Sequence, residues 1–242
     1  MGFWSSLASV ASSVASGICS AVSNIGGALS SFVGSVAPVL SGLISALQPV
    51  AEAIGKFANS FLQGLGILQP GEKVQELGER ALQAAQSGIV IDKFDNFGGY
   101  MDALRKFEID PDLSAKRSPA EKLVAGLGVG TVAVEDKYNA ERGSLNGMWL
   151  LPIANPGYFT PERMQSLVST GRLGSDVYAY LEQRLLGHES RSFEHKLENS
   201  PEGGRLSAAD LNQLYGALDS ARTQWADLAK QMQQPQQNTP GA

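Results

Sequence analysis

The sequence predicts an all-α protein, with apolar, Gly/Ala/Ser-rich helices at the amino terminus followed by a compact helical domain. Two observations predict this class. Large apolar residues recur every three or four positions, which is the spacing of one helix face. Proline follows a serine or threonine at Ser118-Pro119 and Thr160-Pro161, as is typical of helix starts. The chain divides into a membrane-active or self-associating helical segment (1–65), a hinge (66–71), a helical globular domain (72–232) and a disordered tail (233–242).

The charges are distributed very unevenly along the chain. The first 51 residues contain no Asp, Glu, Lys, Arg or His, and Glu52 is the first charged residue. Residues 1–65 hold only Glu52 and Lys56, which cancel, so the whole net charge of -5 lies on residues 66–242. Solvated helix faces normally carry charged residues. We therefore expect the amino-terminal segment to be buried in a lipid bilayer or against copies of itself.

The amino-terminal segment is expected to form two or three short helices. Gly26-Gly27, Pro38 and Pro49 interrupt its apolar pattern, because glycine and proline break or kink a helix. Small residues four apart lie opposite the apolar face and favour close helix contacts in lipid. Because serine is frequent in this segment, binding of its helices at the membrane surface, or insertion only under some conditions, is expected at least as much as a helix that spans the bilayer. The residues expected to contact lipid are Phe3, Trp4, Leu7, Val10, Val14, Ile18, Val22, Ile25, Leu29 and Phe32.

The domain that follows carries a helix that is apolar on nearly all sides. It starts at Ser118-Pro119 and reaches Glu135, which predicts a central buried helix. Within it, Gly126, Gly128 and Gly130 indicate close helix packing and not a nucleotide loop, because no strand precedes them. Other helices are expected over 72–87, over 100–107, from Thr160, over 175–187 and over 207–231 with a break near Gly216, and a solvated charged turn is expected over 188–195.

A candidate catalytic group lies at the end of the central helix. Glu135 follows a run of apolar residues, so desolvation would raise the pKa of its carboxyl group. A carboxyl group that stays protonated near neutral pH can donate a proton to a glycosidic oxygen. The opposing interpretation is that Glu135 is simply the first solvated residue after a core helix.

Residues 109–152 resemble the lysozyme-like lytic transglycosylases. Residues 109–113 are similar to the hydrophobic-Asp-Pro-x-Leu turn of that family, and Glu135 lies where the family has its catalytic Glu. The resemblance implies a lysozyme-like domain in which Glu135 acts as acid and then as base. Asp136 and Leu150 depart from the family pattern, where Ser and Gln are usual. The residues that the resemblance assigns to glycan binding are Tyr138, Asn139, Gly147, Met148 and Trp149.

The overall organisation resembles that of phage ejection and pilot proteins, which pair an apolar Gly/Ala/Ser-rich amino terminus with a helical body. The resemblance implies a virion-associated, membrane-interacting protein that helps a genome or particle cross the bacterial envelope. Its expected location is the virion or the cell envelope, and its expected partners are a lipid bilayer and further copies or other virion proteins. The alternatives are a peptidoglycan-cleaving transglycosylase anchored by its amino terminus, and a secreted pore-forming effector.

Composition argues against several other classes of function. The net charge of -5 argues against nucleic-acid binding, which needs a basic face. Cys19 is the only cysteine, so no internal disulfide can form. His188-Glu189 and Glu194-His195 lack the spacing of a known metal site. We expect neither a metal nor a cofactor.

Overall fold

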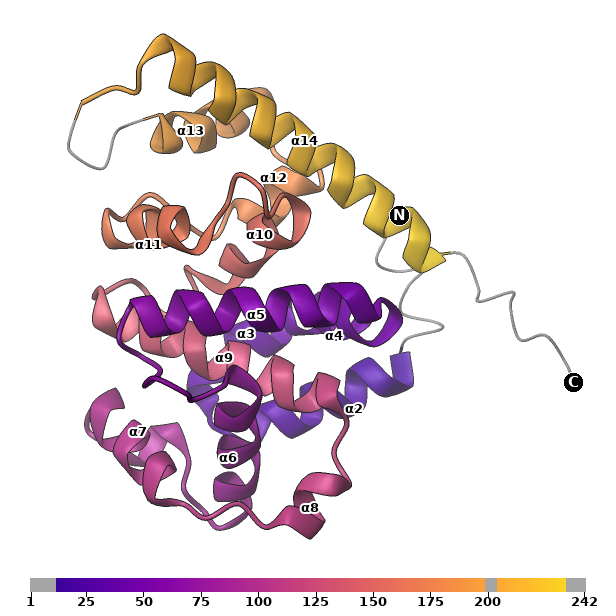
Figure 1. The fold of residues 1–242 in the computed structure, drawn as a ribbon, viewed down its shortest axis with the longest axis vertical. Helices are drawn as coiled ribbons and strands as arrows, with labels where there is room; N and C mark the ends of the chain where they lie inside the picture. The colour runs from indigo at the N-terminus through magenta and orange to yellow at the C-terminus, as the bar shows by residue number, and fades with distance from the viewer. Residues whose placement is uncertain (1–11, 199–203, 234–242) are drawn as a thin grey trace, which may run out of the picture.

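The computed structural model describes residues 12–198 and 204–233 (Figure 1). All secondary-structure elements within these ranges are α-helices or 3-10 helices. The predicted all-α class is therefore confirmed. The expectations for residues 1–11 and for the tail from residue 234 onwards lie outside the described residues.

The amino-terminal segment is divided where its glycine and proline residues predict. Gly26 separates the first two elements and adopts a φ of +154°, which residues with a side chain rarely take. Pro38 and Pro49 each lie in the first turn of a helix, where a missing N–H does no harm. The elements are α2 (Ser12–Ser23), η1 (Gly27–Leu29), α3 (Ser30–Ser35), α4 (Ala37–Ala46) and α5 (Gln48–Gly64).

A turn with positive φ at Gly66 and Gly71 leads from α5 into the next group of helices. The side chains of Asn96 and Asp110 cap two of these helices by accepting backbone N–H groups of the first turn. The elements are α6 (Val74–Gln86), η2 (Ile91–Lys93), α7 (Phe97–Lys106) and α8 (Pro111–Ala115).

The predicted central helix is α9 (Pro119–Lys137), and every residue from Leu123 to Glu135 is buried. Ser118 and Glu121 form a capping box at its start, since each side chain accepts the backbone N–H of the other residue.

The glycines of α9 allow other helices to approach its backbone. A methyl group on Gly126 would overlap the carbonyl oxygen of Val74, and one on Gly78 would overlap that of Lys122, so α6 and α9 cross with their backbones in contact. A methyl group on Gly128 would lie 3.2 Å from Phe32. The prediction of close helix packing at these glycines is confirmed.

The carboxyl-terminal third corrects three expectations. The helix expected over 175–187 is wrong, because α12 ends at Leu181 and Gln183 adopts a φ of +56°. The charged turn expected over 188–195 is wrong, because these residues lie in the helix α13 (Gly187–Leu197). The expected break at Gly216 is absent, since α14 runs through it. The elements are η3 (Asn146–Trp149), α10 (Leu150–Ala154), α11 (Pro161–Ser169), α12 (Val177–Leu181), α13 (Gly187–Leu197) and α14 (Ala208–Gln233).

The helices are arranged around one hydrophobic core. In Figure 1, α3, α4 and α5 cross the middle of the molecule, with α6–α8 below them and α10–α14 above. α2 and α4 pack against α9, and α5 packs against α11. The core includes residues from Ile18 to Trp225. The described part of the amino-terminal segment therefore shares its core with the rest of the chain.

Candidate functional sites

The first candidate site is the part of the chargeless amino terminus that the structure describes, residues 12–51, which we call the uncharged segment. Of the residues expected to contact lipid, Phe3, Trp4, Leu7 and Val10 lie outside the described residues, and Val14 is 53% exposed. The others face the protein interior and are at most 2% exposed: Ile18, Val22, Ile25, Leu29 and Phe32.

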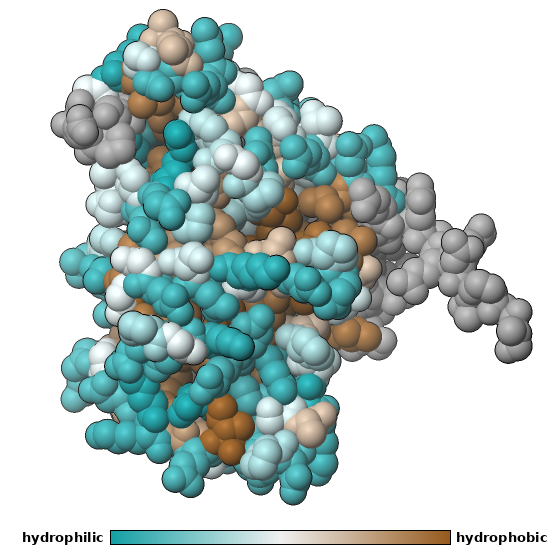
Figure 2. Space-filling view, in the orientation of Figure 1, coloured by the Kyte–Doolittle hydropathy of each residue, from teal (hydrophilic) through white to brown (hydrophobic). Residues whose placement is uncertain are grey.

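Most large apolar side chains of the uncharged segment are buried, so they contribute little to the surface of the molecule. The face shown in Figure 2 is mainly hydrophilic, with its largest hydrophobic area at the right and a smaller hydrophobic patch low in the view. Within the described residues, no single helix is long and apolar enough to cross a membrane. Gly27–Ser35 and Ala37–Ala46 reach the required length and hydropathy only together, and they are bent by 60°. We call these two pieces the bent pair.

The second candidate site is Glu135, in the last turn of α9, where it is 1% exposed. Its Oε1 accepts the backbone N–H groups of Gly143 at 2.9 Å and Leu145 at 3.1 Å. Arg142 Nη1 lies 3.7 Å from Oε2. Burial raises the pKa of Glu135, while the two N–H groups and Arg142 act in the opposite direction. The carboxylate thus holds the loop after α9 against the end of that helix.

The residues expected to bind a glycan beside Glu135 lie in two environments. Tyr138 is half-buried and Asn139 is exposed, in the turn that follows α9. Gly147, Met148 and Trp149 are buried in η3. The indole N–H of Trp149 donates to Thr131 Oγ1 at 2.8 Å, and its ring meets Phe61 edge-on at 5.6 Å. In this structure, protein covers both the Glu135 carboxylate and the η3 residues.

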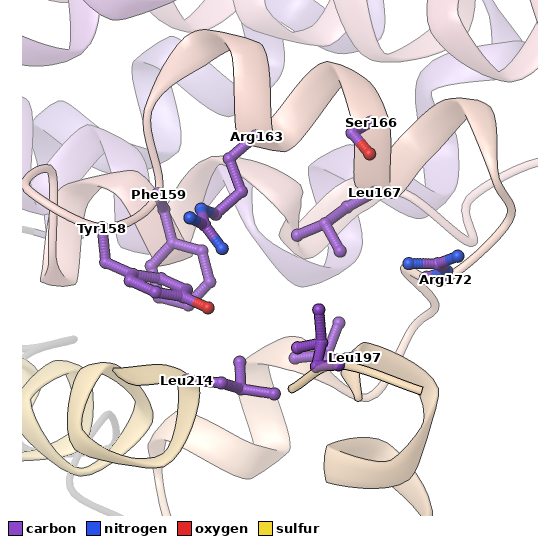
Figure 3. Close-up of a pocket in the computed structure, with 9 residues that line it drawn as sticks. Tyr158, Phe159, Arg163, Ser166, Leu167, Arg172, Leu197 and Leu214 are labelled. Carbon is purple, nitrogen blue, oxygen red and sulfur yellow. The ribbon is translucent and has the colours of Figure 1, made fainter. Parts of the chain in front are cut away.

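A small hollow lies between α11 and the α13–α14 region (Figure 3). Its cavity volume is only about 40 Å³, and Leu167, Leu197 and Leu214 line it with apolar side chains. The guanidinium of Arg163 lies 4.0 Å from the ring centroid of Tyr158 at its edge. No sequence motif predicts this hollow, because its lining comes from separate stretches of the chain.

A wider, open groove with a volume of about 650 Å³ lies between α5, α6, α8 and α9, and most of the residues that line it are polar or charged. Two of the acidic residues that line it have basic partners: Glu79 pairs with Arg117 at 2.7 Å, and Glu76 pairs with Arg80 at 2.8 Å. The first pair joins α6 to the residue just before α9, whereas the second lies within α6 itself. Among the residues that the structure describes, no group of three or more His, Cys, Asp or Glu side chains could hold a metal ion.

Comparison of the chain with protein-family models, with curated proteins and with solved structures gives no match. What this protein does is therefore inferred from its own residues and geometry.

Proposed function

We propose that this chain is a membrane-interacting delivery protein, associated with a phage particle, that helps a genome or particle pass across the bacterial envelope. In this proposal the uncharged segment is stored in the core of the folded chain and enters a bilayer after release. The observation that supports it is the combination of 51 successive residues without a charge and the burial of their described part inside a helical domain.

A bilayer offers the stored helices an environment similar to the core that they leave. A charged residue at the centre of a membrane helix costs about 2.5–3.5 kcal/mol on insertion scales, and the uncharged segment contains none. Helices also satisfy their own backbone groups, as lipid requires. If the bent pair straightened, its residues from Gly27 to Ala46 would span about 30 Å, the thickness of a hydrocarbon core.

Contacts between copies follow from the same composition. α2 exposes Gly17 and Ser20 on its outer side, and Asn24, in the turn just after α2, is exposed as well. Small side chains let helix backbones approach closely in lipid, where helices associate by packing and hydrogen bonds. We therefore include further copies of this chain, or other virion proteins, among the proposed partners in the membrane.

The test adds one charge to the bent pair without disturbing the stored fold. Gly34 and Gly216 are both exposed helical glycines, and a side-chain carbon at either position would meet no atom within 4 Å. Gly34→Lys places a charge inside the bent pair, whereas Gly216→Lys places the same charge on α14. Full-length variants are mixed with lipid vesicles in mild urea, which loosens the stored fold, and bound protein is measured by flotation.

We expect Gly34→Lys to bind roughly 70- to 370-fold more weakly than the native chain, which is the insertion cost of one central charge. Gly216→Lys should bind as the native chain does. The core helices of a water-soluble protein share the composition of the uncharged segment. Equal flotation of both variants, or no flotation of the native chain, would therefore show that this segment serves only as a core.

A further inference from the structure

A carboxylate from a distant part of the chain holds the start of the bent pair. Asp92, in η2, accepts hydrogen bonds from the backbone N–H groups of Gly27 and, at 3.1 Å, Ala28. Beside it, the N–H of Ile91 donates to the carbonyl oxygen of Ile25 at 3.1 Å. The η2 turn thus satisfies backbone groups on both sides of Gly26.

The glycine pair leaves the space that this contact needs. A methyl group on Gly26 would lie 3.1 Å from Asp92 Oδ2 and 3.3 Å from the backbone nitrogen of Ile91. One on Gly27 would lie 3.3 Å from the same carboxylate oxygen. Gly26-Gly27, interpreted in the sequence as a helix break, therefore also admits the η2 turn to the backbone.

The contact stabilises the stored position of the bent pair and no other. The first N–H groups of a helix lack acceptors within it and carry partial positive charge, so a carboxylate is a favourable partner for them. A hydrocarbon interior has no carboxylate to replace Asp92, so release of the bent pair must break this contact. An interaction made in only one of two states shifts the equilibrium toward that state.

A second polar contact holds α3 from another direction. Asn146 Nδ2 donates to Ser31 Oγ at 2.9 Å and to Ser35 Oγ at 3.2 Å. These bonds join neutral groups, and neutral hydrogen bonds are weaker than charge-assisted ones. Asp92 is therefore the stronger of the two attachments.

We propose that the contact of Asp92 with Gly27 and Ala28 is a latch that keeps the bent pair stored, and that opening this latch controls its release. That the released helices then enter a bilayer rests on the proposed function. The opening itself takes place in water and is measured without lipid.

The test follows opening by hydrogen–deuterium exchange in full-length chains without lipid. Asp92→Ala removes the latch, and Asp92→Asn keeps one oxygen acceptor without the charge. Asp95→Ala is the matched control, because Asp95 is also exposed and follows η2 closely. Alkylation of Cys19, the only thiol, gives a second readout on α2.

We expect exchange across residues 27–46 to be about tenfold faster in Asp92→Ala, the equivalent of one charge-assisted hydrogen bond. Asp92→Asn should lie between the native chain and Asp92→Ala, and Asp95→Ala should match the native chain. The proposal is overturned if exchange over 27–46 is unchanged, or if it rises equally in α6 and α9, since that is general destabilisation. Faster opening without faster vesicle binding keeps the latch and contradicts the membrane function.

Discussion

The helices α4 and α9 are both apolar and buried, but their ends differ. α4 begins after Val36 without a side-chain cap and carries no charge. α9 begins in the capping box of Ser118 and Glu121 and carries the buried carboxylate of Glu135 in its last turn. Moving α9 into lipid would bring ionised groups with it, whereas moving α4 would not. If α4 is stored for release, as we propose, its burial alone does not set it apart from α9, and the difference lies in the charged groups that α9 carries and α4 lacks.

The glycines of the two regions differ in the same way. Gly126 of α9 touches the backbone of α6, so this crossing tolerates no side chain. Gly17 and Gly34, in the uncharged segment, have no atom within 4 Å of the position of a side-chain carbon. α9 is fixed in place by backbone contact, while the outer side of the uncharged segment has free space around it.

The largest expected effect comes from adding one methyl group to each region. Gly126→Ala should lower the free energy of unfolding by about 3 kcal/mol, because overpacking at a backbone contact cannot be relieved by turning a side chain. Gly34→Ala should leave stability unchanged or raise it by up to about 1 kcal/mol, because alanine favours helix over glycine. Urea denaturation of both variants measures the difference. Equal stability would mean that α6 and α9 are not in backbone contact.

A smaller effect is expected at the hydrogen bond between Thr131 and Trp149. Thr131→Val would leave the buried indole N–H without an acceptor, which costs about 1–3 kcal/mol. Thr131→Ser is the matched control, since it keeps the hydroxyl group and removes only a methyl group. Thermal and urea unfolding should rank the valine variant below the serine variant. The opposite order would show that Trp149 is not held by α9.

Much of the fold could be predicted because local chemistry determines it. Ser118-Pro119 with Glu121 marks the start of α9, and glycine and proline divide the uncharged segment at the observed places. These signals act within a few residues, so they can be identified in the sequence alone. The raised pKa of Glu135 was likewise expected from the apolar run before it.

Contacts between distant residues could not be predicted. Residues 175–187 have helical spacing, yet α12 stops early and α13 folds back on it, with the Tyr180 hydroxyl donating to Glu194 at 2.8 Å. No residue pattern near Glu135 predicts that its carboxylate accepts the backbone N–H groups of Gly143 and Leu145. The sequence also shows that the uncharged segment requires burial, but not that the remainder of the same chain provides the core.

The smallest expected effect concerns the charge of Glu135. Because burial raises its pKa in the folded state above the ordinary value of 4.5, the folded chain binds this proton more tightly than the unfolded chain does. The resulting stabilisation is fully present below pH 4.5 and is lost as the pH rises through the folded pKa. Glu135→Gln keeps an oxygen acceptor for both N–H groups without a charge. We expect it to be more stable than the native chain at neutral pH, with the difference vanishing toward pH 4.5.

Urea denaturation across this pH range measures the effect, and Glu141→Gln, an exposed carboxylate of the same loop, is the control. If Glu135→Gln is less stable than the native chain at neutral pH, then burial of the ionised carboxylate does not destabilise the folded chain, and the prediction is wrong. The same proteins are then incubated with peptidoglycan. Lysis by the native chain that Glu135→Gln abolishes would favour the transglycosylase alternative, because a residue that only closes a loop does not cleave glycan. Absence of lysis in both, together with the stability gain, assigns Glu135 to the fold.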